Sequence, residues 1–370
     1  MREYSQRITS LVVKKMGQKK SKPVASPAKA APAATSAPAP VASSKTAEKP
    51  SGKQDAATKQ TGTFKDSYTL GKELGKGNYS TVRLAVSKKT NEECAVKCIQ
   101  KKKLTPEDDE ALKIEVAILA EVEHPSIIKL HGFFEEPLDY YIVTELMSGG
   151  ELFDRIVARE FYSENDAQKV VRTLGECLLY LHERDIVHRD LKPENILLKD
   201  KSDDAAIKIA DFGFARFVKE GCRTACGTPG YVAPEIITGK IYGKGVDVWS
   251  LGIIIYILLC GYPPFYHRNQ AQLFKLIREA RFEFDSPYWD PISSNAKDLI
   301  KGCLTVDEKK RLTMQGVLTH PWVSGAASKA DITPVLGELK KFNARRKLRA
   351  GIKAAIAANR MMDIASAIRG

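Results

Sequence analysis

The sequence has no run of about eighteen apolar residues, the length that a membrane-spanning helix needs. Its most apolar stretch, Leu251 to Cys260, is too short to span a bilayer and predicts a buried helix. The N-terminus lacks the apolar core followed by small residues that marks a signal peptide. Arg2 excludes N-myristoylation, which needs glycine at that position. We therefore expect no membrane span and a protein of the cytoplasm or the nucleus.

Cysteine is scarce and shows no pairing pattern. The seven cysteines are odd in number and scattered, which suits reduced thiols in an intracellular protein. Cys222 and Cys226 share one predicted loop and could be redox-sensitive. Ordinary thiols are the favoured interpretation, because no histidine or second cysteine pair completes a metal site there.

Acidic residues are almost absent from the two ends of the chain. Residues 1–60 carry a formal charge of +9 and residues 339–370 carry +8, whereas the chain between them carries −4. The total of +13 therefore does not describe one basic surface, and we predict no nucleic-acid partner. The N-terminal excess is typical of a solvated arm, whereas the C-terminal one coincides with a predicted helix.

Large apolar residues are rare in the tail formed by residues 1–63. Residues 1–20 could form a short basic amphipathic helix, whereas residues 21–63 are rich in Ala, Pro, Ser, Thr and Lys and have almost nothing to bury. Such a segment cannot offset its ordering entropy, so we predict a disordered tail. From Tyr68 the pattern changes to short strands around one helix, which begins with a favourable first turn at Pro106. The strands are expected at 68–74, 81–87, 93–99, 128–135 and 140–145, and the helix at about 106–122. Amphipathic helices then dominate as far as Trp322, which predicts an α+β fold with a small β-rich lobe and a larger helical lobe.

Gly75 and Gly77 lie between the first two predicted strands. Such glycines let a hairpin backbone approach phosphate oxygens with its N–H groups facing them. Ser80 replaces the third glycine of the usual pattern, and an ordinary glycine hairpin would look the same. A dinucleotide-binding fold is excluded, because a strand and not a helix follows the loop.

Lys97 lies on the next predicted strand, among apolar neighbours. A lone lysine on a strand is normally a surface residue, but the preceding glycine loop favours a phosphate-binding role. Glu115 lies mid-helix in an equally apolar setting, and a carboxylate there needs a buried partner. Lys97 is the candidate partner.

The segment His188-Arg-Asp-Leu-Lys-Pro-Glu-Asn195, followed by Asp211-Phe-Gly213 and Ala233-Pro-Glu235, closely resembles the protein kinase family. The resemblance implies a bilobal kinase domain at 68–322, with lobes at 68–146 and 147–322. It implies that Asp190 accepts the proton of the substrate hydroxyl and that Lys192 steadies the transferred phosphoryl group. Asn195 and Asp211 would hold Mg²⁺, with ATP as the second cofactor. These roles fit a reaction that needs positioning and charge neutralisation.

Further positions follow from the same resemblance. Thr144 would lie behind the adenine, the backbones of Glu145 and Met147 would bond it, and Glu151 would reach the ribose. With Glu194, Glu151 could also attract a basic residue of the substrate, although either could be an ordinary surface carboxylate. Lys192 and the segment Gly227-Thr-Pro229 resemble serine/threonine kinases rather than tyrosine kinases. The residues expected to sandwich the adenine are Leu74, Val82, Ala95 and Leu197.

Four segments sharpen the resemblance to the calcium/calmodulin-dependent protein kinases: 143–155, 226–235, 258–265 and 339–348. Thr224 resembles the activation-loop threonine of types I and IV, which implies an upstream activating kinase. Type II enzymes instead autophosphorylate a threonine at the position of Val335, so that form of autonomy is not expected here. Without an association domain we expect a monomer, and without an EF-hand loop calcium would act through external calmodulin.

Residues 323–370 are expected to form the autoinhibitory and calmodulin-binding segment. Basic amphipathic helices of this kind bind calmodulin or a membrane surface. Leu339 and Ile352 could be the two end anchors, but Phe342 with Ile356, or Leu348 with Met361, are competing registers. The other expected contacts are basic: Arg345, Arg346 and Lys347.

Without calmodulin, the apolar face of this segment should pack on the acidic kinase body and block Glu151 and Glu194. Truncation near Thr333 is then expected to free the enzyme from calcium. A helix that merely docks, or a solvated basic tail, is the plainer interpretation. Two alternatives for the whole chain are a catalytically silent scaffold and a constitutive kinase. The scaffold is disfavoured because a silent kinase typically lacks Lys97, Asp190 or Asp211, and all three are present.

Overall fold

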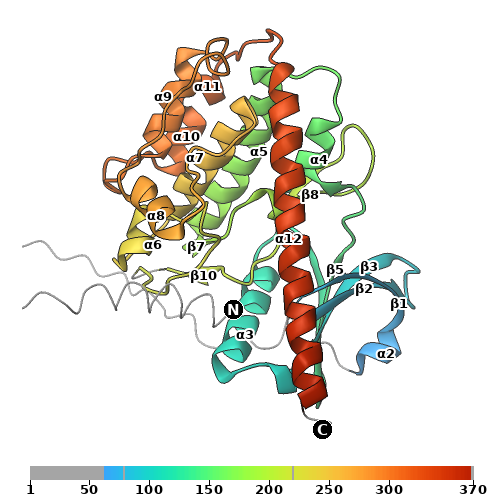
Figure 1. Cartoon of the computed structure of the whole chain (residues 1–370). Helices are drawn as coiled ribbons and strands as arrows, with labels where there is room; N and C mark the ends of the chain where they lie inside the picture. The colour runs from blue at the N-terminus through green and yellow to red at the C-terminus, as the bar shows by residue number, and fades with distance from the viewer. Residues whose placement is uncertain (1–61, 78–79, 219–220, 368–370) are drawn as a thin grey trace, which may run out of the picture. The chain divides into compact units, whose positions relative to one another are not determined.

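The structure is a computed structural model that describes residues 62–77, 80–218 and 221–367, with side chains through Ile352. The predicted disordered tail, apart from its last two residues, lies outside the described residues. Two lobes follow, one β-rich and one helical (Figure 1). The predicted α+β kinase fold is thereby confirmed.

The N-lobe is an antiparallel sheet in the order β1-β2-β3-β5-β4, with α3 packed on it. A capping box starts α3, in which the backbone N–H of Asp108 donates to the Thr105 hydroxyl at 3.2 Å. Leu112 and Val116 of α3 share an apolar cluster with Phe133 of β4. The elements are α2 (Phe64–Ser67), β1 (Tyr68–Lys76), β2 (Ser80–Ser87), β3 (Glu93–Gln100), η1 (Lys101–Lys103), α3 (Pro106–Glu121), β4 (Leu130–Glu135) and β5 (Asp139–Glu145).

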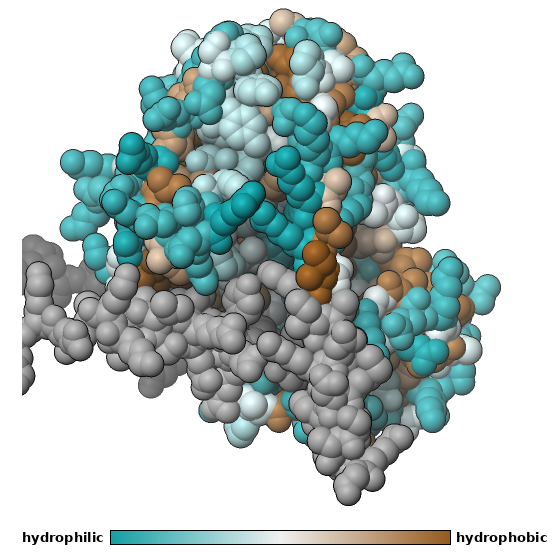
Figure 2. All heavy atoms as spheres, in the orientation of Figure 1, coloured by the Kyte–Doolittle hydropathy of each residue, from teal (hydrophilic) through white to brown (hydrophobic). Residues whose placement is uncertain are grey.

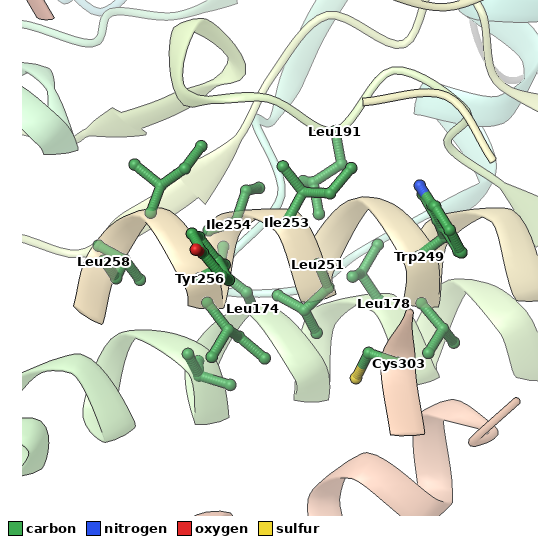
Figure 3. Close-up of a cluster of buried hydrophobic side chains, with 14 of the residues drawn as sticks. Leu174, Leu178, Leu191, Trp249, Leu251, Ile253, Ile254, Tyr256, Leu258 and Cys303 are labelled. Atoms are coloured by element: carbon green, nitrogen blue, oxygen red, sulfur yellow. The ribbon is translucent and has the colours of Figure 1, made fainter. Parts of the chain in front are cut away.

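The C-lobe is built around α7, whose residues from Val246 to Cys260 are all buried. This confirms the buried helix predicted for the most apolar stretch. Figure 3 shows side chains of neighbouring helices pointing toward α7, among them Leu174 and Leu178 of α5 and Cys303 of α9. The helices are α4 (Leu152–Val157), α5 (Glu164–Glu183), α6 (Pro234–Thr238), α7 (Gly245–Cys260), α8 (Gln270–Arg278), α9 (Ser294–Cys303), α10 (Met314–Thr319) and α11 (Pro321–Ser324).

Five short strands and one turn of 3₁₀-helix lie between residues 150 and 217. In the three-stranded sheet β6-β8-β9, Glu151 pairs with Leu197, so two residues expected around the nucleotide are held together. None of the described helices has both the length and the apolar character to cross a membrane. These elements are β6 (Gly150–Glu151), β7 (Ile186–Val187), η2 (Pro193–Asn195), β8 (Ile196–Leu198), β9 (Ile207–Ile209) and β10 (Arg216–Phe217).

The long helix α12 (Pro334–Ala367) ends the described chain and packs on α4 and α7 (Figure 1). Val335, Leu336 and Leu339 belong to the C-lobe core, so the first turns of α12 are part of that lobe. Gly261, which has φ +85°, permits the close approach, since a Cβ there would lie 2.6 Å from the backbone N of Leu339.

Candidate active site

A buried carboxylate sets the backbone of the catalytic loop, which we define as residues 188–195. Asp247 accepts hydrogen bonds from the backbone N–H groups of His188 and Arg189, both at 2.9 Å. Its Oδ2 also lies 3.0 Å from Nε2 of His182. Burial alone would raise the pKa of Asp247, but the hydrogen bond and charge of His182 outweigh it and lower that pKa. Asp247 therefore stays charged and keeps the loop in place.

Asp190 is the centre of a small polar network at the end of this loop. Its Oδ1 accepts a hydrogen bond from the Thr228 hydroxyl at 2.8 Å, and its Oδ2 pairs with Lys192. Lys192 also donates to Thr228 at 3.2 Å. The carboxylate is thus oriented by a hydroxyl group and an ammonium group. This geometry suits a base for a hydroxyl proton, next to a cation for the moving phosphoryl group.

Lys97 of β3 and Glu115 of α3 form the ion pair expected from the sequence, with Nζ 2.9 Å from Oε1. Burial would lower the pKa of Lys97, but the charges of Glu115 and Asp211 outweigh it and raise that pKa. Lys97 therefore remains a cation, as the expected phosphate-binding role requires. In protein kinases this pair must be in place for activity.

Asn195 and Asp211 fit the predicted role of metal ligands. The Asn195 side-chain NH₂ donates to the backbone oxygen of Asp190 at 2.9 Å, which leaves its carbonyl oxygen available. Asp211 adopts a left-handed backbone with φ 60°. In the described part of the chain, no group of three or more His, Cys, Asp or Glu could hold a metal alone. Two oxygen ligands completed by phosphates are typical of a nucleotide-bound divalent cation.

The residues expected around adenine come from adjacent strands. Ala95 of β3 pairs with Thr144 of β5, Val82 of β2 pairs with Lys97, and Gly75 pairs with Val82. The Gly77 backbone N–H donates to Ser80 O at 2.8 Å and closes the hairpin around Asn78 and Tyr79, which lie outside the described residues. Leu74 is partly exposed and Met147 follows the end of β5.

Two lysines that the sequence reasoning missed hold the segment after β5. The carboxylate of Glu145 lies 2.8 Å from Lys199 and 2.7 Å from Lys208. Burial would raise the pKa of Glu145, but hydrogen bonds from these lysines lower it. The side chain is therefore occupied, which fits the expectation that only the backbone of Glu145 bonds adenine. Lys208 is the one polar residue of β9. A lysine between two apolar strand residues could have indicated a buried acidic partner.

The comparisons with known proteins agree with this geometry. The family of the protein kinase domain matches residues 68–323. The chain is 47% identical over 311 residues to a calcium/calmodulin-dependent protein kinase type 1 of Macrobrachium nipponense, covering 83% of this chain and 90% of that protein. The chain belongs to the calcium/calmodulin-dependent protein kinases.

Two further relatives are calcium/calmodulin-dependent protein kinases of other types. The chain is 46% identical to the type IV kinase of Mus musculus, covering 81% of this chain and 64% of that protein. It is 44% identical to the type II kinase of Caenorhabditis briggsae, covering 81% and 57%. The chain therefore spans most of the type 1 relative but less than two thirds of these two longer ones.

The acidic pair expected to recognise substrate is occupied by α12. Arg346 pairs with Glu151, and its Nη1 lies 3.2 Å from Oε1 of Glu194. The next residue, Lys347, pairs with Asp154 of α4. Burial would lower the pKa of Arg346, but Glu194 and Glu151 outweigh it and raise that pKa. In this conformation the kinase holds its own arginine where a basic substrate residue is expected.

The expected calmodulin segment is divided into two different environments. Leu339 is fully buried and Phe342 is partly buried. Leu348 and Ile352, in contrast, are 64% and 50% exposed. The expectation that the kinase body covers the whole apolar face was therefore wrong for the second part. The exposed face of α12 is otherwise largely hydrophilic (Figure 2). Arg345 is exposed, and the side chain of Ile356 lies outside the described residues.

Thr224 lies exposed on the activation loop, which we define as residues 221–233. Its backbone oxygen accepts a hydrogen bond from the Tyr242 hydroxyl at 2.6 Å. Arg189 of the catalytic loop donates to the same hydroxyl at 2.8 Å. Tyr242, which sequence reasoning missed, thus joins the two loops.

Proposed function

We propose that this kinase transfers the γ-phosphate of ATP, with Mg²⁺ as the divalent ion, to serine or threonine in basic sequence contexts. The observation that carries the proposal is Arg346, which is bound between Glu151 and Glu194. A guanidinium bound between two carboxylates supports a surface that selects basic groups. A substrate arginine or lysine near the phosphorylated hydroxyl would make the same contacts.

We infer that α12 is the brake and that calcium-loaded calmodulin releases it. Leu348 and Ile352 are exposed and apolar on a basic helix, which is how calmodulin targets are recognised. Binding there would draw Arg346 off the two glutamates, because all three residues lie within two turns of one helix. Calmodulin can then engage the exposed residues before any buried residue has to leave the C-lobe.

The test is transfer to a basic serine peptide with Mg²⁺ and ATP, with and without calcium and calmodulin. Arg346→Ala should raise activity in the absence of calmodulin, since it frees Glu151 and Glu194. Lys340→Ala is the matched control, because it removes the same charge from an exposed position of α12. Equal calcium-free activity of Arg346→Ala and the wild type would refute the brake.

We also propose that an upstream kinase activates the enzyme by phosphorylating Thr224. A phosphate would add close to two negative charges next to Arg189. Arg189 is held by Tyr242, whose hydroxyl already contacts the Thr224 backbone. Burial, together with repulsion from the nearby charge of Arg189, lowers the pKa of Arg216. A phosphate would relieve this repulsion and order the loop. A Thr224→Ala variant that the upstream kinase activates as fully as wild type would refute the switch.

A further inference from the structure

The guanidinium of Arg189 has an unusual set of partners. Its Nε donates to the backbone oxygen of Phe214 at 2.5 Å, and its Nη1 donates to the Tyr242 hydroxyl at 2.8 Å and to the Cys222 sulfur at 2.9 Å. In the described part of the chain, no carboxylate lies within ion-pair distance of Arg189. A thiol therefore lies where an anion would be expected.

Cys226, which follows Thr224 in sequence whereas Cys222 precedes it, also lies near the Tyr242 hydroxyl. Its sulfur lies 3.7 Å from the Tyr242 hydroxyl. Cys222 is tied to Tyr242 by two backbone hydrogen bonds, of 2.9 and 3.0 Å, and by a side-chain hydrogen bond. Both thiols thus contact one phenol, although three residues separate them in sequence.

The two thiols differ in reactivity. Burial works against ionisation of Cys222, but hydrogen bonding with Tyr242 and the charge of Arg189 outweigh it and lower the pKa of that thiol. Cys222 is also only partly buried, so a small oxidant can reach it. Cys226 is buried, and burial raises its pKa. One thiol is suited to react first and the other to attack the product.

We propose that Cys222 and Cys226 are a peroxide-oxidisable thiol pair that closes a disulfide across the activation loop. The Cys222 thiolate attacks one oxygen of hydrogen peroxide, the O–O bond breaks, and with one proton the products are a sulfenic acid and water. The Cys226 thiol then displaces hydroxide from that sulfur, and its proton completes a second water. Two thiols lose two electrons in total, and the peroxide accepts both.

The disulfide would affect the catalytic loop through Thr228 and Arg189. Cys226 is two residues from Thr228, which orients the Asp190 carboxylate at 2.8 Å. Joining the sulfurs also draws Cys222 away from Arg189, which loses its thiol partner. Both effects disturb the network that positions the base, so oxidation should lower the rate of transfer.

A second consequence rests on the proposed role of Thr224. The disulfide would enclose Thr224 in a five-residue ring and hinder its phosphorylation. Conversely, a phosphate on Thr224 would compete with Cys222 for Arg189 and protect the thiol from oxidation. Oxidation and phosphorylation would then exclude each other on one loop.

The first experiment treats the full-length, unphosphorylated kinase with hydrogen peroxide and maps its disulfides by mass spectrometry. Trypsin cleaves after Arg223 and so places the two thiols on different peptides. The expected result is a linked pair of these peptides that disappears with dithiothreitol. Linked peptides that join either cysteine to another residue, or no linked pair at all, would overturn the proposal. This readout does not depend on any role of Thr224.

The second experiment measures transfer to a basic serine peptide with calcium and calmodulin. Peroxide should reduce the rate several-fold, and dithiothreitol should restore it. Cys222→Ser should keep its own rate under peroxide, whereas Cys98→Ser should lose activity like wild type. Cys98 is a matched control because it is partly buried, lies in the N-lobe, and has a pKa raised by burial to about 11. A linked pair that leaves the rate unchanged would refute the regulatory part.

If Cys222→Ser proved unstable, Cys226→Ser would still decide the matter. It should accumulate sulfenic acid at Cys222, detectable by dimedone, without forming the disulfide. Absence of dimedone labelling would contradict the reactivity assigned to Cys222. Normal disulfide formation together with a fully active Thr224→Ala variant would refute only the proposed phosphorylation switch.

Discussion

Asp190 depends on residues outside its own loop for its orientation. Thr228 reaches it from the activation loop, and Asp247 of α7 holds the backbone on its N-terminal side. The Asp190 carboxylate is therefore positioned by the catalytic loop, the activation loop and α7, which come together only in the folded C-lobe. Substitutions at these residues should have effects that differ in kind.

Asp190→Asn should reduce phosphoryl transfer by about 10²- to 10⁴-fold, the usual contribution of a general base. ATP binding should change little, because the Asp190 carboxylate contacts Thr228 and Lys192 and is not among the residues expected to bind the nucleotide. Steady-state kinetics and nucleotide titration would separate the two quantities. Asp203→Asn, on the exposed surface, controls for the change of charge. Retention of a large share of turnover would show that another group is the base.

Asp247→Asn should instead destabilise the fold, by about 3 kcal/mol if two charge-assisted hydrogen bonds are weakened. Because the folded-state pKa of Asp247 lies below its ordinary value of 3.8, its charge stabilises the protein above pH 3.8, and this stabilisation is lost as the pH falls toward the folded-state pKa. We therefore expect the free energy of unfolding, measured with urea between pH 7 and pH 3, to fall less steeply with decreasing pH for the variant than for wild type. If the free energies of unfolding of the two proteins fell in parallel with pH, the stabilising charge would not be that of Asp247.

The sequence was sufficient to propose the catalytic residues, because phosphoryl transfer restricts both their types and their spacing. The Lys97–Glu115 pair was also predictable, since a carboxylate on an apolar helix face needs a cation. Tyr242 could not be predicted in this way. Its role arises from a contact with Arg189 across 53 residues of chain, and no local pattern distinguishes it from any other buried tyrosine.

At the scale of elements, α12 combines two functions in one uninterrupted helix. Its first turns fill the C-lobe core with Val335, Leu336 and Leu339, and the following turns carry Arg346 and the exposed Leu348. The sequence predicted a basic amphipathic helix correctly. It did not show where burial ends, because the same apolar spacing serves a lobe interface and a calmodulin surface.

This division adds a consequence to the expected truncation near Thr333, which would also remove part of the C-lobe core. A chain ending at Thr333 should unfold at a lower temperature than the full-length protein, because three apolar side chains leave the core at about 1.5–3 kcal/mol each. A chain ending at Ala344 should keep the full-length melting temperature and be active without calcium, since it lacks Arg346. Differential scanning calorimetry and peptide phosphorylation would test both. Equal melting temperatures of the two truncations would show that the first turns of α12 are not structural.

At the scale of the whole kinase, Glu151 could link the binding of α12 to the binding of ATP. It pairs with Arg346 of α12 in the structure, and the family resemblance gives it the ribose of ATP. One carboxylate that serves both partners makes nucleotide binding and α12 release mutually favourable. Coupling of this kind is reciprocal by thermodynamic necessity.

Calcium-loaded calmodulin should therefore tighten ATP binding, and ATP should tighten calmodulin binding by the same factor, within about 5- to 150-fold. Titrating a fluorescent ATP analogue with and without calmodulin, and labelled calmodulin with and without ATP, would give the two factors. Arg346→Ala should reduce both toward one, because Glu151 is then free in every state. Lys340→Ala should leave both at their wild-type values. If both factors were one in the wild type, Glu151 would not link the nucleotide to the brake, and α12 would act on the protein substrate alone.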